Sequence, residues 1–184
     1  YNNIKTINAT EEALKSSVNE TLIQIQSNVE STFNQYKYIA NALTENPDII
    51  RFMNGKLDGN AIDLYILQGS IFQTSLQNEY IDSIYIYNES TKNVLGTNVC
   101  TSLNNFPDKG WVESYTEQKQ YFSVFQRRDE IYADKPIITV IRKFKVLGAS
   151  DFYGAVIINI RHSIFSNIFK KTSAKDFMNI YITD

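Results

Sequence analysis

The chain has 184 residues, 43% of them hydrophobic and 21% charged, which is typical of a globular domain large enough to bury a core. Its 18 basic and 20 acidic residues give a net charge of -2 and are mixed along the sequence, so it lacks the basic tract of a nucleic-acid-binding protein. A single cysteine and a single histidine exclude a disulfide framework and a multi-histidine metal site. The sequence has no phosphate loop or nucleophile elbow. We therefore expect no enzyme activity, no catalytic residues, no metal and no cofactor.

The first quarter of the sequence predicts one long amphipathic helix over residues 9–43. Its apolar positions recur every three or four residues: Leu14, Val18, Leu22, Ile25, Val29, Phe33, Tyr36 and Ala40. No Gly or Pro interrupts this helix, which would be about 50 Å long at 1.5 Å per residue. It is either a long core helix of an ordinary domain or a rod that also packs along a second copy. Because the apolar stripe is longer than one small domain covers, we expect weak homodimerisation through it.

The middle of the chain changes from helical to strand patterns. Asn46 and Pro47 are typical of a helix start, so a short helix is expected over residues 48–54, and a further helix over 61–79. A short helix around Trp111 is expected over 110–117, and another over 163–171. Strands are predicted at residues 81–87, 94–97, 121–126, 137–146 and 153–160. The expected fold is α+β, with the long helix packed on an antiparallel sheet of about five strands.

Two of these strands are nearly continuous apolar runs, at residues 137–141 and 155–158. Such runs are typical of a sheet that is covered on both faces. We expect the long helix to cover one face and the segment around Trp111 to cover the other.

The end of the chain repeats an earlier pattern. Residues 84–88 read Ile-Tyr-Ile-Tyr-Asn, and residues 180–184 read Ile-Tyr-Ile-Thr-Asp. Either two strands resemble each other by chance, or a sixth strand at 177–183 opens a second copy of the module. The second interpretation divides the chain into a helix over 1–45, a sensor-like module over 46–172, and the start of a second module over 173–184.

Aromatic and hydroxyl side chains in the second half could form a pocket wall. Trp111 lies on the expected short helix, and Tyr121, Ser123 and Phe125 alternate along the next strand. Aromatic walls with a few polar groups are typical of small-ligand sites. The alternative is that all four residues pack in the core.

Three arginines are candidates for binding an anionic ligand. Arg127 and Arg128 could bind a carboxylate, but a solvated turn in which they pair with Asp129 and Glu130 is the favoured interpretation. Arg142 interrupts an apolar strand, where an unpaired buried charge would be costly. It therefore faces solvent, pairs internally or faces a pocket.

The order of elements and four segments give the sequence a resemblance to a known family. The segments are 80–87 (YIDSIYIY), Gly110-Trp111, 136–144 (PIITVIRKF) and 153–160 (YGAVIINI). They resemble the extracellular Cache sensor domains, in particular the double Cache sensors of transmembrane histidine kinases from Gram-positive bacteria. The resemblance covers nearly the whole chain but rests on hydrophobic patterns.

The resemblance implies a PAS-like sheet with a small-molecule pocket on the face opposite the long helix. Amino-acid-binding Cache domains carry an Arg two residues before the Trp and an Asp in the last strand, where this chain has Lys109 and Asn159. Amino-acid binding is therefore in doubt. The candidate ligand-binding residues are Tyr85, Lys109, Trp111, Tyr121, Ser123, Phe125, Arg127, Arg142 and Asn159.

The function implied by the resemblance is extracellular sensing of a small molecule by a two-component histidine kinase. Binding would displace helices that run to membrane spans outside these residues. The alternatives are the ligand-binding domain of a chemotaxis receptor and a structural or adhesive cell-surface module without a ligand.

Overall fold

The computed structural model describes residues 2–56, 61–128, 131, 135–145 and 152–171. The chain divides into two compact units. One unit contains the residues up to Asn34 together with the segment that begins at Ser163, and the other contains Gln35–His162. The expected strand at 177–183 lies outside the described residues.

The long N-terminal helix is confirmed as α1, Asn2–Glu45. In the first unit its Phe33 meets Phe165 of α5 (Ser163–Lys171) edge-on, with ring centroids 6.3 Å apart. Ile25 is buried, whereas Leu14 and Leu22 of the same apolar stripe are 64% and 44% exposed. Part of the stripe is therefore uncovered within the chain.

Two shorter helices follow in the second unit, α2 (Pro47–Met53) and α3 (Ala61–Leu76). The expected start of α2 is confirmed: the side-chain oxygen of Asn46 accepts from the backbone N–H groups of Asp48 and Ile49. Helix α3 ends three residues earlier than the sequence indicated.

The sheet has six strands in the order β3-β2-β1-β6-β5-β4, and every neighbouring pair is antiparallel. The strands are β1 (Ile81–Asn88), β2 (Asn93–Leu95), β3 (Cys100–Ser102), β4 (Phe122–Arg127), β5 (Ile137–Lys145) and β6 (Phe152–Arg161). The predicted α+β class is confirmed. The edge strand β3 was missed because three residues are too short to show a strand period.

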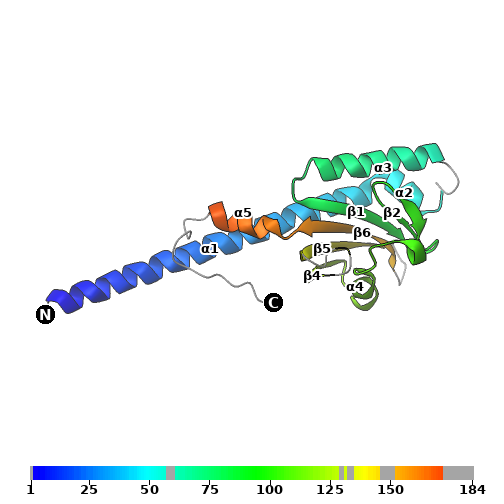
Figure 1. Cartoon of the computed structure of the whole chain (residues 1–184). Coiled ribbons are helices and arrows are strands. Elements are labelled where there is room, and N and C mark those ends of the chain that lie inside the picture. Colours follow the sequence, from blue (N-terminus) through cyan, green and yellow to red (C-terminus); the bar gives the residue numbers. More distant parts are fainter. Residues whose placement is uncertain (1, 57–60, 129–130, 132–134, 146–151, 172–184) are drawn as a thin grey trace. The chain divides into compact units, whose positions relative to one another are not determined.

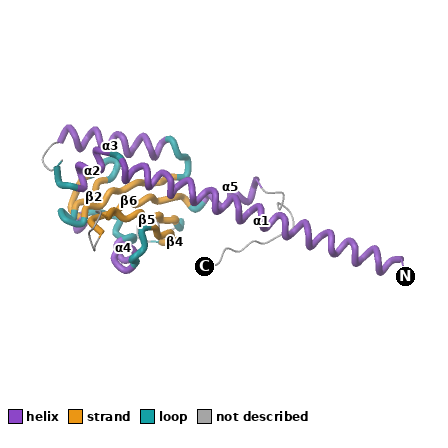
Figure 2. The backbone as a smooth tube through the Cα atoms, turned by 180° about the vertical axis from the view of Figure 1, so that it is seen from behind, coloured by secondary structure: helices purple, strands orange, loops and turns teal. Residues whose placement is uncertain are grey.

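Helices cover one face of the sheet, and a loop with the short helix α4 (Val112–Glu117) covers the other (Figures 1 and 2). On the helix face, the Asn88 side-chain amide donates to the carbonyls of Phe52 and Met53 at 3.0 Å, which joins β1 to α2. Arg142 Nε donates to Asn41 Oδ1 of α1 at 2.9 Å, so this arginine pairs internally. The expectation that both faces are covered is confirmed.

The α4 face of the sheet holds an aromatic core. Its buried members are Tyr87, Val94, Phe106, Trp111, Tyr115, Ile141, Ala155 and Ile157. The Tyr87 ring meets the rings of Trp111 and Tyr115 edge-on at 5.3 and 5.2 Å. Gly154 has φ +154°, and a Cβ there would lie 2.1 Å from the Tyr87 carbonyl oxygen, so the sheet requires glycine at this place.

Candidate functional site

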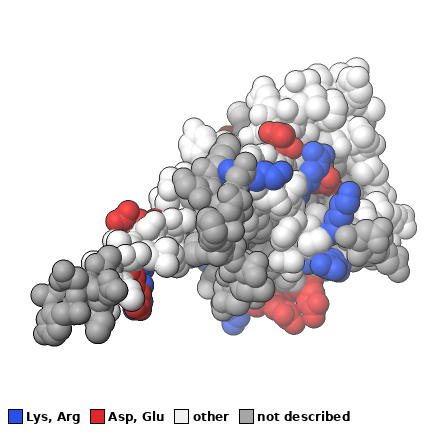
Figure 3. Space-filling view, turned by 60° about the vertical axis from the view of Figure 1, so that its left-hand side comes forward, with Lys and Arg blue, Asp and Glu red and all other residues white. Residues whose placement is uncertain are grey.

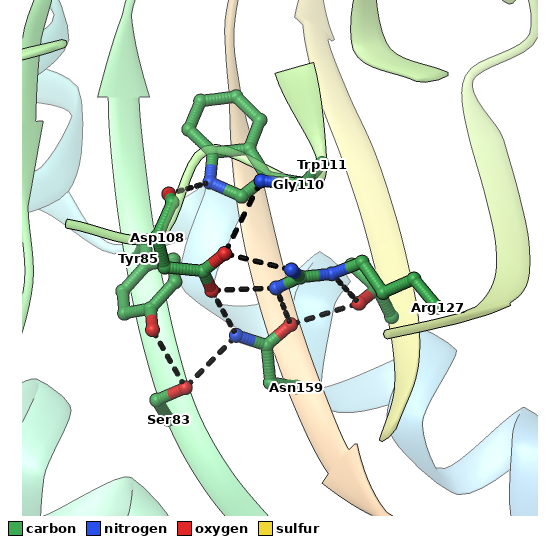
Figure 4. A network of polar contacts seen from close by, with 8 residues as sticks. Ser83, Tyr85, Asp108, Gly110, Trp111, Arg127 and Asn159 are labelled. Carbon is green, nitrogen blue, oxygen red and sulfur yellow. Dashed lines mark hydrogen bonds and ion pairs between the residues drawn. The ribbon is translucent and has the colours of Figure 1, made fainter. Parts of the chain in front are cut away.

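The α4 face contains a cluster of buried polar side chains, here called the polar cluster (Figure 4). Its members come from four strands, β1, β4, β5 and β6, and from the loop before α4: Ser83, Tyr85, Asp108, Arg127, Thr139 and Asn159. The cluster lies beside Trp111, whose indole N–H donates to the Asp108 carbonyl at 2.9 Å.

The centre of the polar cluster is a bidentate ion pair. Arg127 Nη1 lies 2.7 Å from Asp108 Oδ1, and Nη2 lies 2.5 Å from Oδ2. The exposed fractions of the two side chains are 6% and 1%. Arg127 Nε also donates to Thr139 Oγ1 at 2.8 Å. Fork-to-fork pairing of this kind is the strongest form of protein ion pair and holds both groups in one geometry.

Asn159 completes the hydrogen bonding of the pair from the central strand β6. Its Oδ1 accepts from Arg127 Nη2 at 3.2 Å and from Thr139 Oγ1 at 2.9 Å. Its Nδ2 donates to Asp108 Oδ2 at 3.1 Å and to Ser83 Oγ at 2.9 Å. The charges of Arg127 and Asp108 are thus neutralised within the chain, and both the oxygen and the nitrogen of the Asn159 amide are hydrogen-bonded. The ion pair is closed in the sense that each charged side chain has its counter-ion inside the polar cluster.

The expectation of a solvated turn at Arg127 is wrong. Strand β4 continues through Arg127, so this residue shares a face with Ser123 and Phe125 and points into the protein. Its partner is Asp108, which the sequence reasoning missed, although it immediately precedes Lys109. Asp129 and Glu130 lie outside the described residues.

The four residues expected to wall a pocket are not brought together as one group. Trp111 is fully buried in the aromatic core, and half-buried Phe125 packs against that core. Ser123 is buried, and its Oγ has no hydrogen-bond partner within the part of the chain that the structure describes. Tyr121 is 48% exposed and meets the Phe152 ring edge-on at 5.3 Å.

The remaining candidates lie in different places. Tyr85 meets Phe106 edge-on at 4.8 Å, and its hydroxyl accepts from Ser83 at 3.0 Å. Lys109 is exposed, and its ammonium donates to the Asn104 carbonyl at 2.6 Å. Arg142 bonds α1 on the helix face. The structure therefore groups Tyr85, Trp111, Arg127 and Asn159 around Asp108.

A surface cavity of about 610 Å³ lies near the end of α4. We call it the lysine cavity and define it by Tyr115, Lys119, Tyr121, Lys143, Lys145 and Phe152. Glu89 is its acidic member. The volume is within the usual range for small-molecule sites, about 300–1,000 Å³.

The innermost cation of the lysine cavity is Lys143, whose exposed fraction is 3%. Its ammonium donates to the carbonyls of Tyr115 and Gln118 near the end of α4. It also lies 4.8 and 4.9 Å from the ring centres of Tyr115 and Phe152. Its partners in the described residues are carbonyls and rings, with no carboxylate among them.

Burial shifts the pKa values of two side chains that line the lysine cavity. Desolvation lowers the pKa of Lys143, because the buried ammonium loses water. Desolvation, together with the nearby Glu89 carboxylate, raises the pKa of the Tyr115 hydroxyl. Glu89 is itself paired with Lys92. The cavity is therefore positive at neutral pH and suits an anionic group.

The face of the molecule shown in Figure 3 carries charges of both signs. Figure 3 shows Lys and Arg side chains at several separate places, with Asp and Glu between them. Within the described ranges there is no group of three metal-ligating side chains, and no helix there is long and apolar enough to cross a membrane.

No family model matches the sequence, and no curated protein matches it. Solved structures match the fold. A domain of a protein assigned to the sensory box/GGDEF family from Vibrio parahaemolyticus has a TM-score of 0.62 and 12% identity, over 86% of this chain and 64% of that one. The sensory domain of the Campylobacter jejuni chemoreceptor Tlp3 with isoleucine bound has a TM-score of 0.62 and 14% identity, over 88% and 64%.

A third match is the extracellular domain of vpHK1S-Z8, a protein assigned as a histidine kinase, with a TM-score of 0.59 and 11% identity over 81% of this chain and 57% of that one. The chain thus spans less than two-thirds of each of these three proteins' chains. At identities of 11–14%, the likeness concerns the fold. The chain has the fold of the sensory domains of bacterial receptors.

Proposed function

We propose that this chain is the extracellular, ligand-sensing input domain of a two-component sensor histidine kinase. The support is a PAS-like fold shared with sensory domains of receptors, together with a cavity of small-molecule size. The proposal includes membrane spans outside these residues, a homodimer through α1, and a second, membrane-proximal module that begins near residue 173. The assignment to a double Cache kinase of a Gram-positive bacterium belongs to the same proposal.

The observation that carries the proposal is the lysine cavity. A ligand at the polar cluster would have to displace Asp108 from Arg127, because both atoms of each charged fork are already bonded. Lys143 has no carboxylate partner among the described residues, and the rings of Tyr115 and Phe152 lie beside its ammonium. We therefore place the ligand in the lysine cavity and expect a small anion with an apolar body. A free amino acid fits less well, because Glu89, the acidic residue of the cavity, is already paired with Lys92 and leaves no free carboxylate for an ammonium group.

Strand β5 offers a route from the cavity to the long helix. Successive side chains of a strand point to opposite faces. Lys143 lines the cavity, and its neighbour Arg142 bonds Asn41 of α1 across the sheet. A ligand that draws Lys143 away from the α4 carbonyls would change the pleat of β5 and with it the Arg142–Asn41 contact. Displacement of α1 is the signal that this proposal requires.

A thermal-shift screen of small carboxylates and phosphate esters tests this function. A ligand stabilises the folded state by RT ln(1 + [L]/Kd), about 2.7 kcal/mol at a hundredfold excess over Kd. We expect Lys143→Met to abolish the shift and Lys109→Met to preserve it, because Lys109 is an exposed lysine that does not line the cavity. An equal shift in Lys143→Met would refute the cavity as the site. A chain that no compound stabilises would favour the structural module.

The second candidate is the ligand-binding domain of a chemotaxis receptor, favoured by the likeness to the Tlp3 sensory domain. The two functions differ in the cytoplasmic half of the protein. A kinase core downstream of the domain supports the first, and a methyl-accepting coiled coil supports the second.

A further inference from the structure

Helix α3 is apolar on two opposite faces, and its own domain covers only one of them. Leu67 and Ile71 are fully buried against the domain. The opposite face presents seven residues, here called the α3 stripe: Ile62, Tyr65, Ile66, Gly69, Phe72, Gln73 and Leu76. Its five large apolar side chains are 42–77% exposed. An apolar stripe of this kind on a surface helix marks an interaction surface.

The spacing of the α3 stripe is symmetric about Gly69. The other six residues lie three, four and seven positions before and after it. At roughly 100° per residue, all of them fall within about 60° of the direction of Gly69, and Leu67 and Ile71 point about 160° away. A pattern that is the same in both directions suits a two-fold axis through Gly69. Two antiparallel copies would then place Ile62 against Leu76 of the partner subunit.

Gly69 itself is not required by the fold of its own chain. A Cβ at this position would meet nothing within 4 Å, so the domain has room for any side chain. A glycine inside a helix costs about 0.5–1 kcal/mol relative to alanine. At the centre of the stripe, however, the missing side chain lets the backbone of a second helix approach closely.

Charge and area favour a second copy of this chain as the occupant. None of the seven stripe residues is Lys, Arg, Asp or Glu, and Asp63, the acidic residue of α3, is bonded to Arg51 at 2.9 Å. In Figure 3, the upper part of the molecule, at the height of α3 in Figure 1, is almost free of charged side chains. Two such faces meet without repulsion.

The five apolar side chains expose an area on the order of 500–600 Å², compared with about 800 Å² per partner in a standard interface. The contact would be weak.

We propose that the α3 stripe is a self-association surface on which two copies of the chain pair antiparallel across Gly69. This inference is independent of the proposed ligand and of the pairing expected through α1.

Sedimentation velocity of the whole chain at rising concentration tests the surface. The wild type is expected to shift from monomer to dimer towards millimolar concentration. Gly69→Glu has room in the monomer but sets two carboxylates face to face in the dimer, so association should weaken at least tenfold. The matched control is Ser70→Glu, which adds the same charge one position off the stripe and should leave association unchanged. Leu14→Glu tests the α1 contact separately.

Crosslinking locates the axis. In a background with Cys100→Ser, Gly69→Cys should form a disulfide-linked dimer at least tenfold faster than Ser70→Cys, because a two-fold axis through position 69 brings the two Cα atoms within disulfide reach. A chain that stays monomeric at every concentration would overturn the proposal. So would association that Leu14→Glu abolishes and Gly69→Glu leaves intact, or α3-dependent binding to lipid vesicles by a monomeric chain.

Discussion

The polar cluster and the lysine cavity lie on the same face of one sheet, and each is built around a buried cation. Arg127 meets the two oxygens of Asp108 at 2.7 and 2.5 Å, and its Nη2 and Nε also donate to Asn159 and Thr139. Lys143 is buried to a similar degree but donates to backbone carbonyls. Arg127 has a counter-ion within the chain, whereas Lys143 has none in the part of the chain that the structure describes and lies beside a cavity.

The difference follows from the chemistry of the two side chains. The planar guanidinium of Arg127 matches a carboxylate in a fixed geometry, which makes the pair a rigid part of the core. The ammonium of Lys143 is a point charge on a flexible stem, and it can turn from the α4 carbonyls towards a ligand. The comparison teaches that a buried charge indicates a ligand site only when the chain has not already supplied its counter-ion.

Breaking the ion pair should give the largest effect. Arg127→Met leaves the Asp108 carboxylate buried without a counter-ion, and the free energy of unfolding should fall by about 3–5 kcal/mol. Arg128→Met is the matched control, since Arg128 is exposed and its replacement should change stability by less than about 0.5 kcal/mol. Chemical denaturation measures both. Equal effects would show that the polar cluster is not a structural core.

Trp111→Ala tests whether the residue nearest the polar cluster belongs to the core. Because Trp111 is fully buried among Tyr87 and Tyr115, its loss should also cost about 3–5 kcal/mol. The thermal shift caused by a ligand of the lysine cavity should survive in the folded fraction. A variant that keeps wild-type stability but loses the ligand shift would instead make Trp111 a pocket residue.

Asn159→Asp should have an intermediate effect. The new carboxylate would replace the amide donor that lies 3.1 Å from Asp108 Oδ2, so two carboxylates would face each other beside one Arg127. The expected cost at neutral pH is about 1–3 kcal/mol. Mutual repulsion raises the pKa of one of the two carboxyls in the folded variant. The free energy of unfolding of the variant should therefore rise as the pH falls and that carboxyl is protonated. A variant as stable as the wild type from pH 4 to 8 would contradict the closed ion pair.

Lys143→Met should have the smallest effect on stability, within about 1 kcal/mol at pH 7, because an apolar side chain of similar length removes both a buried charge and its carbonyl contacts. The pH dependence is the sharper readout. Folding lowers the pKa of Lys143 below its ordinary 10.5, so the unfolded chain binds more protons between those two values. Wild-type stability should therefore rise relative to the variant as the pH approaches 10.5. Parallel curves would mean that Lys143 is not desolvated.

The fold was largely predictable from the sequence, and the site was not. Three features were predictable because each can be read within a short stretch of sequence: the apolar period of α1, the cap at Asn46, and the apolar runs of β5 and β6. The partnership of Asp108 with Arg127 joins a loop to a strand end nineteen residues later and depends on where β4 ends. The sequence predicted that the strand ends at residue 126, but β4 includes Arg127, and the side chain of Arg127 is therefore buried instead of solvated. Strand β3 was missed because three residues carry no period.

The structure of the chain bound to the compound that gives the largest thermal shift tests the central claim most directly. Our account predicts that the anionic group of the compound lies in the lysine cavity, within hydrogen-bond distance of Lys143 Nζ, with the Asp108–Arg127 pair intact. A compound bound to Arg127 and Asn159, with Asp108 displaced, would contradict it.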